Sequence, residues 1–316
     1  MAYYRCSRVL FLLTIFNIFS ISAYAEYPNR YIKIINPIPS GSSDLVCRIV
    51  GKKLSERVNQ QVVIENVPGA HGNIAKQSLL NSAGDGYTLL FVPGNLFTVN
   101  PFFYKEDIDY RNFVPIVAIG KISNVMVVPS SLNISTIEKF NEYARNNNVN
   151  YASSGIGSSL HISALMYEKI FNIKMQHIPY VSPMQAMIDT VANRIQVIFH
   201  LIPVVQQNIE NGKLTGLMIL DSKKSSSLPK IPTSYDLGYN ELQSYAWYFL
   251  MAPKDTPKTI INKLYNEVNL ILRDEGFLNT AKKIGLNVLG GDDQFIDYMI
   301  VEETKKYKNL LSNISK

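Results

Sequence analysis

The sequence predicts an α/β fold of two lobes, each a mostly parallel sheet flanked by helices. The chain has 316 residues, a length typical of about two domains. Short β-prone runs alternate along it with helical patterns of about ten to fifteen residues. The same alternation starts again after Asn124. We therefore expect one lobe from residues 26–124 and 246–316, with the other, residues 125–245, inserted into it.

The composition excludes several classes of protein. Hydrophobic residues make up 47% of the chain and charged residues 18%, which suits packed cores and argues against a disordered chain. The 31 Lys and Arg residues exceed the 25 Asp and Glu residues, but no basic run or basic stripe concentrates them, so nucleic-acid binding is not expected. The one long apolar stretch is too short and too isolated for a polytopic membrane protein.

That stretch has the three parts of a secretory signal peptide. Arg5 and Arg8 form a positive region, residues 9–21 are apolar, and Ala23-Tyr24-Ala25 is a small-x-small cleavage site. The alternative is an N-terminal membrane anchor, for which the apolar span is short. We expect cleavage after Ala25, which leaves a chain that begins at Glu26 and carries 29 basic against 25 acidic residues.

Removal of the signal peptide would also change the number of cysteines. Cys6 would leave with the signal peptide, so Cys47 alone would remain and no internal disulfide could form. Cys47 falls on the inner face of a helical pattern, where a buried structural thiol is expected rather than a reactive one.

In the first lobe, strands end at Pro or Gly signals and helices follow them. The helix after residue 44 places Leu45, Ile49 and Val50 on one face, with Val58 near its end. The expected strands are 31–36, 62–64, 88–92 and 245–251, and the expected helices are 45–58, 73–81, 258–273 and 293–311.

The second lobe repeats this pattern. Residues 221–232, rich in Ser, Lys and Pro, are typical of a flexible linker. The expected strands are 125–128, 149–152, 175–178, 195–199 and 217–220, and the expected helices cover 136–145 and begin near residues 160, 182 and 204.

Three strand-to-helix loops carry hydroxyls, glycines and free backbone amides: residues 40–44, 153–161 and 180–185. The first amides of a helix are unpaired and lie at the positive end of its dipole, which suits a carboxylate or phosphate. Such loops lie beyond the carboxyl ends of the strands, where open α/β sheets bind ligands. Each loop alone could be a simple N-cap. Three together favour an anion site.

No catalytic or metal constellation is evident. Ser158 or Ser159 with His161 could form a nucleophile and base, but their side chains diverge at the start of a helix. The four histidines lack metal-ligand spacing, and no phosphate-binding P-loop is present. We therefore expect no enzyme activity, no metal and no cofactor.

Several blocks carry a family resemblance, in the right order from about residue 27 to the C-terminus. Glu65-Asn66-Val67-Pro68-Gly69-Ala70-His71-Gly72-Asn73-Ile74 and Asp85-Gly86-Tyr87-Thr88-Leu89-Leu90 are the most specific. The others are Tyr27-Pro28 through Pro37-Ile38-Pro39, Tyr151-Ala152-Ser153-Ser154-Gly155-Ile156-Gly157-Ser158, Ile178-Pro179-Tyr180 and Gly212-Lys213-Leu214. The chain resembles the substrate-binding receptors of tripartite tricarboxylate transporters, also called Bug-type receptors.

The resemblance implies a periplasmic binding protein of the Venus-flytrap, type II-like form that closes on a small carboxylate-bearing solute. It also implies membrane components of such a transporter as partners, a monomeric receptor, and an ordered segment 221–232. With the loops, it assigns solute contacts to Ile38, Ser40, Gly41, Ser42, Asp44, Gly94, Asn95, Ser154, Gly157, Ser158, Ser159, His161, Tyr180, Ser182 and His200. For His161, a ligand contact and a cap-and-packing role are both open.

The chain departs from the family pattern at four places. Its first loop, residues 40–44, is one residue shorter and has lost a glycine, and residues 94–97 are more apolar than usual. Tyr180-Val181-Ser182 replaces a Tyr-Lys-Gly element, and His200 replaces an aspartate.

His200 should end a strand and point into the cleft. A histidine that titrates near pH 6.5 would there favour a more anionic solute, and the alternative is a structural histidine. Two other functions stay open: a degenerate receptor that acts as a signalling or structural partner, and an exported hydrolase on the same scaffold.

Overall fold

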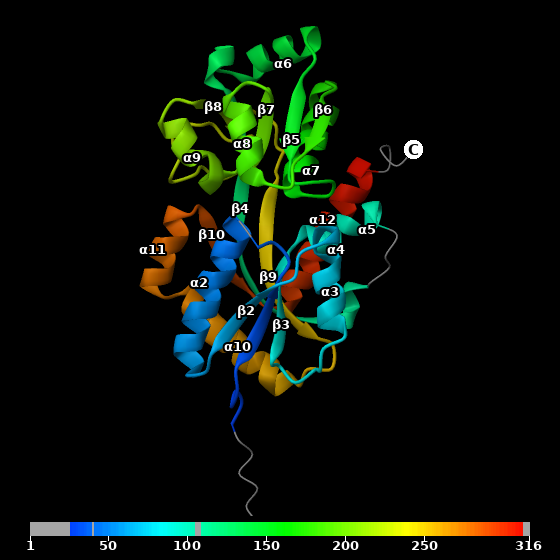
Figure 1. Ribbon diagram of the computed structural model, residues 1–316, viewed down its shortest axis with the longest axis vertical. Coiled ribbons are helices and arrows are strands. Elements are labelled where there is room, and N and C mark those ends of the chain that lie inside the picture. Colours follow the sequence, from blue (N-terminus) through cyan, green and yellow to red (C-terminus); the bar gives the residue numbers. More distant parts are fainter. Residues whose placement is uncertain (1–25, 40, 105–108, 312–316) are drawn as a thin grey trace, which may run out of the picture.

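The computed structural model describes residues 26–39, 41–104 and 109–311. Its helices and strands form two groups, one above the other, and the long strands β4 and β9 run between them (Figure 1). None of the helices in the described ranges combines the length and the low charge needed to cross a bilayer.

The lower group is built on a sheet with the strand order β2-β1-β3-β9-β4, and β10 pairs with β4 at its edge. β1, β2 and β3 are parallel, whereas β9 and β10 run antiparallel to their neighbours. The strands are β1 (Ile32–Asn36), β2 (Val62–Asn66), β3 (Thr88–Pro93), the first part of β4 (Phe113–Pro129), β9 (Tyr245–Pro253) and β10 (Leu286–Gly291).

Helices cover both faces of this sheet because its strands are apolar on both. Ile34 of β1 packs in the core with α2 and α10, and the next residue, Ile35, packs on the opposite face with α3 and α12. The helices are α2 (Gly41–Val58), α3 (Asn73–Leu80), α4 (Asn95–Thr98), α5 (Asn100–Phe103), α10 (Lys258–Leu272), α11 (Glu275–Lys283) and α12 (Asp293–Leu311).

The upper group repeats this arrangement around the end of β4. Three parallel strands stand beside it, and β8 pairs with it antiparallel. Val125 and Val127 of β4 pack with α8 and α9, whereas Met126 and Val128 pack with α6 and α7. The elements are β5 (Asn150–Ser153), β6 (Gln176–Pro179), β7 (Val197–Leu201), β8 (Leu214–Ile219), α6 (Ile137–Asn146), α7 (Ser159–Phe171), α8 (Pro183–Val191) and α9 (Ile202–Glu210).

β4 belongs to both sheets. Residues from Phe113 to Ser123 pair with β9, and those from Asn124 onward pair with β7 and β8. The exchange of partners thus falls at the position where the sequence pattern restarts. The sequence predicted only the end of this strand, because Pro115 and two register shifts interrupt the lower part.

Helix α12 also joins the two groups. Ile296 and Ile300 in its first half pack in a core of the lower sheet. Tyr307, Leu310 and Leu311 near its end pack in a core of the upper sheet. In Figure 1, α12 lies on the side of the molecule that carries α5 and α7, away from α2 and α8.

Other expectations need correction. The linker predicted at residues 221–232 is an ordered loop, because Asp221, Leu228 and Ile231 are buried and anchor it. On α2 the inner face carries Val46, Cys47, Val50 and Leu54, whereas Leu45 is 42% exposed. The structure also adds α11 and β10, which the sequence pattern did not reveal.

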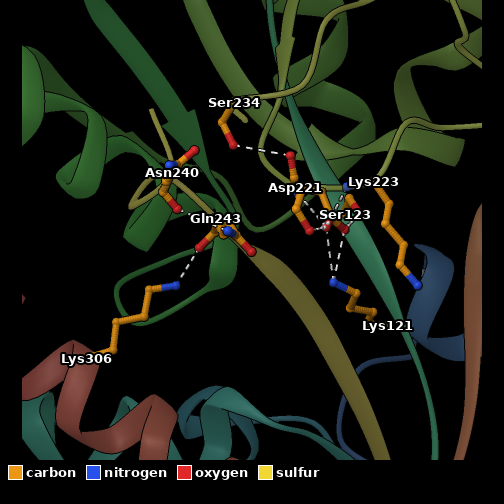
Figure 2. Close-up of polar contacts among 9 residues, drawn as sticks. Lys121, Ser123, Asp221, Lys223, Ser234, Asn240, Gln243 and Lys306 are labelled. Carbon is orange, nitrogen blue, oxygen red and sulfur yellow. Dashed lines mark hydrogen bonds and ion pairs between the residues drawn. The ribbon is translucent and has the colours of Figure 1, made fainter. Parts of the chain in front are cut away.

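Asp221, which follows β8, forms a buried ion pair with Lys121 of β4 at 3.1 Å (Figure 2). Ser123 Oγ and the backbone N–H of Ser222 also donate to its carboxylate, at 2.5 and 2.7 Å. Burial alone would raise the pKa of Asp221, but the hydrogen bond from Ser123 and the charge of Lys121 outweigh it and hold the pKa below its usual value. The pair ties the upper group to the part of β4 that lies in the lower sheet.

Replacing Asp221 with Asn should lower the free energy of unfolding by about 3 kcal/mol, because Lys121 would keep its charge in a buried site without its counter-ion. Urea unfolding of the ligand-free protein measures this. Glu302→Gln is the matched control, since Glu302 pairs with Lys305 at an exposed site and its loss should change the value by about 0.5 kcal/mol or less. Equal effects from the two variants would contradict the prediction.

Candidate functional site

The direction of the strands places one set of loops between the two sheets. β1 and β3 run antiparallel to β9, and β9 runs antiparallel to β4, so β1 and β3 point with β4 toward the upper group. β7 runs antiparallel to β4, so β5, β6 and β7 point back toward the lower group. The carboxyl ends of both sets of strands therefore face the same gap.

A cavity of about 670 Å³ lies at this gap. Its walls combine the loops that follow β1, β3, β5, β6 and β7 with two residues of β9. The lining residues are Ile38, Gly41, Ser42, Ser43, Pro93, Asn95, Ser154, Ser158, Ser159, Leu160, Val181, Ser182, Met184, His200, Leu201, Pro203, Val204, Ala246 and Tyr248.

The structure brings nine of the predicted contact residues together in this lining. They are Ile38, Gly41, Ser42, Asn95, Ser154, Ser158, Ser159, Ser182 and His200. Ser40 lies outside the described residues. Asp44, Gly94, Gly157, His161 and Tyr180 are described but do not line the cavity.

Asp44 holds the first loop in shape. Its carboxylate accepts hydrogen bonds from Asn36 Nδ2 at 2.9 Å and from Arg48 Nε at 2.8 Å. Asn36, which is fully buried, also donates to the carbonyl of Ile38 and to the side chain of Asn66. Through Asn36, Asp44 therefore helps to fix the backbone at Ile38, which lines the cavity.

His161 packs behind the wall. It is 6% exposed, its Nδ1 accepts the Gly157 N–H at 3.3 Å, and its ring centroid lies 4.6 Å from that of His177. Of the two roles left open for His161, this geometry favours packing. Gly157 in turn accepts a hydrogen bond from Asn95 Nδ2 at 2.9 Å, which joins the loop above the cavity to α4 below it.

Tyr180 and Gly94 also make contacts within the protein and do not line the cavity. The Tyr180 hydroxyl donates to Asp189 at 2.8 Å, along α8. The backbone of Gly94 bonds to the Trp247 carbonyl, and a Cβ at Gly94 would lie 2.9 Å from the Trp247 side chain. Gly94 thus allows α4 to start close to β9.

Four helices of nine or more residues start at the cavity: α2, α7, α8 and α9. Ser158 caps α7 by accepting the His161 N–H at 3.2 Å, and Ser182 caps α8 by accepting the Gln185 N–H at 3.4 Å. A proline occupies the first turn of both α8 and α9, where no amide partner is needed. The cavity therefore receives the positive ends of four helix dipoles.

Ser158 has a second internal bond. Its hydroxyl donates to the Gly155 carbonyl at 2.7 Å, in addition to its capping role. Ser158, which was predicted to contact the solute together with Ser159 and the nearby amides, thus makes both of these hydrogen bonds within its own loop. A contact from this loop to a ligand would come from its amides or from Ser159.

Four buried polar atoms in the lining residues have no hydrogen-bond partner within the described part of the chain. They are the hydroxyls of Ser42, Ser43 and Tyr248 and Nε2 of His200. A buried polar group left without a partner destabilises a protein by about 1–3 kcal/mol, so such groups are uncommon. Four of the ten such atoms found among the described residues belong to residues that line this cavity, which favours a polar ligand there.

His200 lies inside β7 rather than at its end and is 4% exposed. The backbone N–H of Leu201 donates to its Nδ1 at 2.8 Å, so in the neutral ring the proton sits on Nε2, the unpartnered atom. Burial lowers the pKa of His200 to about 4. The expected titration near pH 6.5 is therefore wrong, and at neutral pH His200 is an uncharged donor.

The remaining lining residues were not predicted as contacts. Pro203 and Leu201 belong to a fourth strand-to-helix junction, which the strand and helix expected on either side could have indicated. Tyr248 carries no such signal, because it lies in a strand buried on both faces. Among the described residues that line the cavity there is no Lys, Arg, Asp or Glu.

Comparisons with known proteins agree on one family. The model of the family described as "Tripartite tricarboxylate transporter family receptor" matches residues 46–315. Protein BugT of Bordetella pertussis is 28% identical over 292 residues, which cover 90% of this chain and 89% of BugT.

Two solved structures from Rhodopseudomonas palustris share the fold. One, solved with adipate, has a TM-score of 0.85 at 24% identity and covers 91% of this chain and 98% of its own. The other, a protein named MatC with bound malate, has a TM-score of 0.82 at 22% identity and covers 90% of this chain and all of its own.

The buried neutral state of His200 predicts a loss of stability in acid. Between pH 6.5 and about 4 the unfolded chain binds a proton at this residue and the folded chain does not. The free energy of unfolding should therefore fall by about 3 kcal/mol as the pH falls through this window. Urea unfolding at several pH values should show this contribution in the wild type and not in His200→Gln. Parallel pH profiles would contradict it.

Proposed function

The chain belongs to the family of tripartite tricarboxylate transporter receptors, and on that basis we propose that it captures a small carboxylate-bearing solute in the cavity between its two sheets. Membership makes it a periplasmic solute receptor.

The main support for the proposal is that four helix N-termini and several uncharged donors without partners lie at one cavity. The N-terminal ends of α2, α7, α8 and α9 lie at the cavity, so their free backbone amides and the positive ends of their dipoles face it. The Ser42 and Ser43 hydroxyls and His200 Nε2 add neutral donors. Hydrogen bonds to a carboxylate are charge-assisted, so such donors suffice without a salt bridge.

The relatives support a carboxylate as the ligand. The R. palustris proteins that share this fold were solved with adipate and with malate, which are both carboxylates. Neither is more than 24% identical to this chain, so they support the class of ligand and leave its identity open.

We further propose that residues 26–124 and 246–316 move as one lobe and residues 125–245 as the other. The exchange of β4 from one sheet to the other at Asn124 supports this boundary. A solute that contacts both lobes would stabilise the closed state. Lys306 of α12, which donates to the Gln243 carbonyl at 2.5 Å, and the pair of Lys121 with Asp221 would hold the connection between the lobes (Figure 2).

The cellular role follows from the same premise. Residues 1–25 lie outside the described residues, and we propose that they are a signal peptide removed on export. The mature monomer would bind its solute without turnover and deliver it to the membrane components of a tripartite tricarboxylate transporter. The comparisons give no support to a degenerate receptor or to a hydrolase.

Replacing Ser42 and Ser43 with Ala should weaken carboxylate binding at least tenfold, which corresponds to one charge-assisted hydrogen bond of about 1.5 kcal/mol. Calorimetric titration with straight-chain mono- and dicarboxylates, from acetate to octanoate and from oxalate to suberate, measures it. Ser55→Ala is the control, because Ser55 lies at the other end of α2 and bonds to the Gln60 carbonyl. Absence of binding by every carboxylate in wild-type protein would overturn the proposed function.

The exported protein should begin at Glu26. Intact-mass measurement of the exported protein, recovered from both the periplasmic and the membrane fractions, tests this directly. A mass that still contains residues 1–25 would show that the segment is retained as an anchor.

A further inference from the structure

A second cavity, of about 700 Å³, lies on the opposite face of β9 from the first, and its size is typical of a small-molecule site. Tyr245 lines the second cavity and the next residue, Ala246, lines the first, because successive side chains of a strand point to opposite faces. Among the described residues, none lines both cavities. The second cavity is bounded by α7, by residues 240–245 and by α12, on the side of the molecule that carries α5 and α7 (Figure 1).

One buried carboxyl oxygen at this cavity has no donor. Glu303 of α12 lines the cavity and is 7% exposed. The Tyr307 side chain hydrogen-bonds to the Glu303 carboxyl group, but Oε2 has no partner within the described part of the chain. Buried acceptors in proteins are ordinarily bonded to a donor. The cavity therefore lacks one N–H or O–H donor at Glu303.

Two lysines of the same cavity can still bind an anion. Lys306 of α12 donates to the Gln243 carbonyl at 2.5 Å (Figure 2), and Lys169 of α7 donates to the Asn309 carbonyl at 3.0 Å. An ammonium group has three N–H donors, so one such bond leaves two for a ligand. Lys306 is not the partner of Glu303 Oε2, although the two residues lie one helical turn apart on the same face of α12.

The cavity also has an apolar side. Met166, Ile170 and Leu310 line it and belong to, or pack against, the core of the upper sheet. In the described ranges no group of three or more His, Cys, Asp or Glu side chains is arranged to hold a metal ion. The donor that is missing at Glu303 is therefore expected from an organic ligand with an apolar part.

We propose that this cavity is a second binding site, for a zwitterionic amino acid with an apolar side chain. The ammonium group of the ligand would donate to Glu303 Oε2, and its carboxylate would accept from Lys306 and Lys169. Its side chain would pack against Ile170 and Leu310. The adjacent charges of an α-amino acid suit two residues of opposite charge that lie one helical turn apart.

The mixed charge of the lining favours a zwitterion over a simple ion. The carboxylates of Glu241, Glu302 and Glu303 lie in one lining with the ammonium groups of Lys169 and Lys306. A ligand with only a positive charge would meet the two lysines, and one with only a negative charge would meet the carboxylates. A ligand with both charges can place each beside its opposite. The lining of the first cavity differs in having no charged side chain among the described residues.

Substitutions on α12 test the location by calorimetric titration of the mature protein with L-leucine. Glu303→Gln and Lys306→Met should each weaken leucine binding at least tenfold, because each removes one charge-assisted hydrogen bond. Lys308→Met is the matched control: Lys308 is an exposed lysine of α12 that does not line the cavity, and its loss should leave the affinity within about twofold. Urea unfolding checks that the variants fold, and Glu303→Gln, which preserves side-chain size, suffices if Lys306→Met does not.

Two leucine derivatives assign each charge to its residue. N-acetyl-leucine lacks the ammonium group, so it should bind Glu303→Gln no more weakly than wild type. Leucine methyl ester lacks the carboxylate, so it should bind Lys306→Met no more weakly than wild type. Each comparison uses one ligand on two proteins, so binding of a carboxylate in the first cavity cancels.

Three results would overturn the proposal. The first is that leucine does not bind the wild-type protein, and the second is that it binds wild type and Glu303→Gln equally. The third is that Glu303→Gln weakens N-acetyl-leucine as much as leucine, since Glu303 would then not hold the ammonium group. None of these results bears on carboxylate binding in the first cavity, because the two linings are separate.

Discussion

The direction of β4 is the constraint on which the rest of the structure depends. This one strand of 17 residues belongs to both sheets, so it fixes which way every neighbouring strand runs. The parallel strands of the lower group, β1, β2 and β3, run toward the upper group. Those of the upper group, β5, β6 and β7, run toward the lower group. The loops that follow β1, β3, β5, β6 and β7 then meet in the gap, because the carboxyl ends of these strands face it. The Asp221–Lys121 pair and the helix starts around the cavity are consequences of this arrangement.

An uncharged wall suits a receptor that must be stable both with and without its ligand. A buried lysine or arginine would be costly in the empty cavity, because its charge would lose hydration and gain no partner. Helix amides and neutral donors such as His200 Nε2 avoid most of that penalty, yet under the proposed function each would form a strong hydrogen bond with a bound anion. The structure applies this at both ends of the gap, with Ser42 and Ser43 on α2 below and His200 on β7 above. Asp44, which was predicted to contact the solute, is instead paired with Arg48 and does not line the cavity.

Turn chemistry predicted which loops line the cavity better than it predicted the orientation of their side chains. Ser158 and Ser182 cap helices where hydroxyl and glycine clusters follow strands, and this local pattern is visible in the sequence. Which way a side chain points depends on tertiary neighbours, so Tyr180 and His161 proved to bond or pack within the protein. The protonation of His200 was missed for the same reason, since its burial is invisible in the sequence. Tyr248 was missed because a strand that is apolar on both faces has no alternation to show which residues face a cavity.

Helix α12 has a mechanical consequence for the molecule. With its first half in a core of the lower sheet and its end in a core of the upper sheet, it gives the two groups a third connection beside β4 and β9. Two adjacent strands alone would leave the groups free to twist about a common axis, and a third connection displaced to one side opposes that twist. The proposed movement of the two groups would then be a bend about the line through the three connections. Because α12 lies on the side of α5 and α7 (Figure 1), such a bend would open mainly the side of α2 and α8. Solute would therefore enter and leave the cavity through the same opening, on the side of α2 and α8.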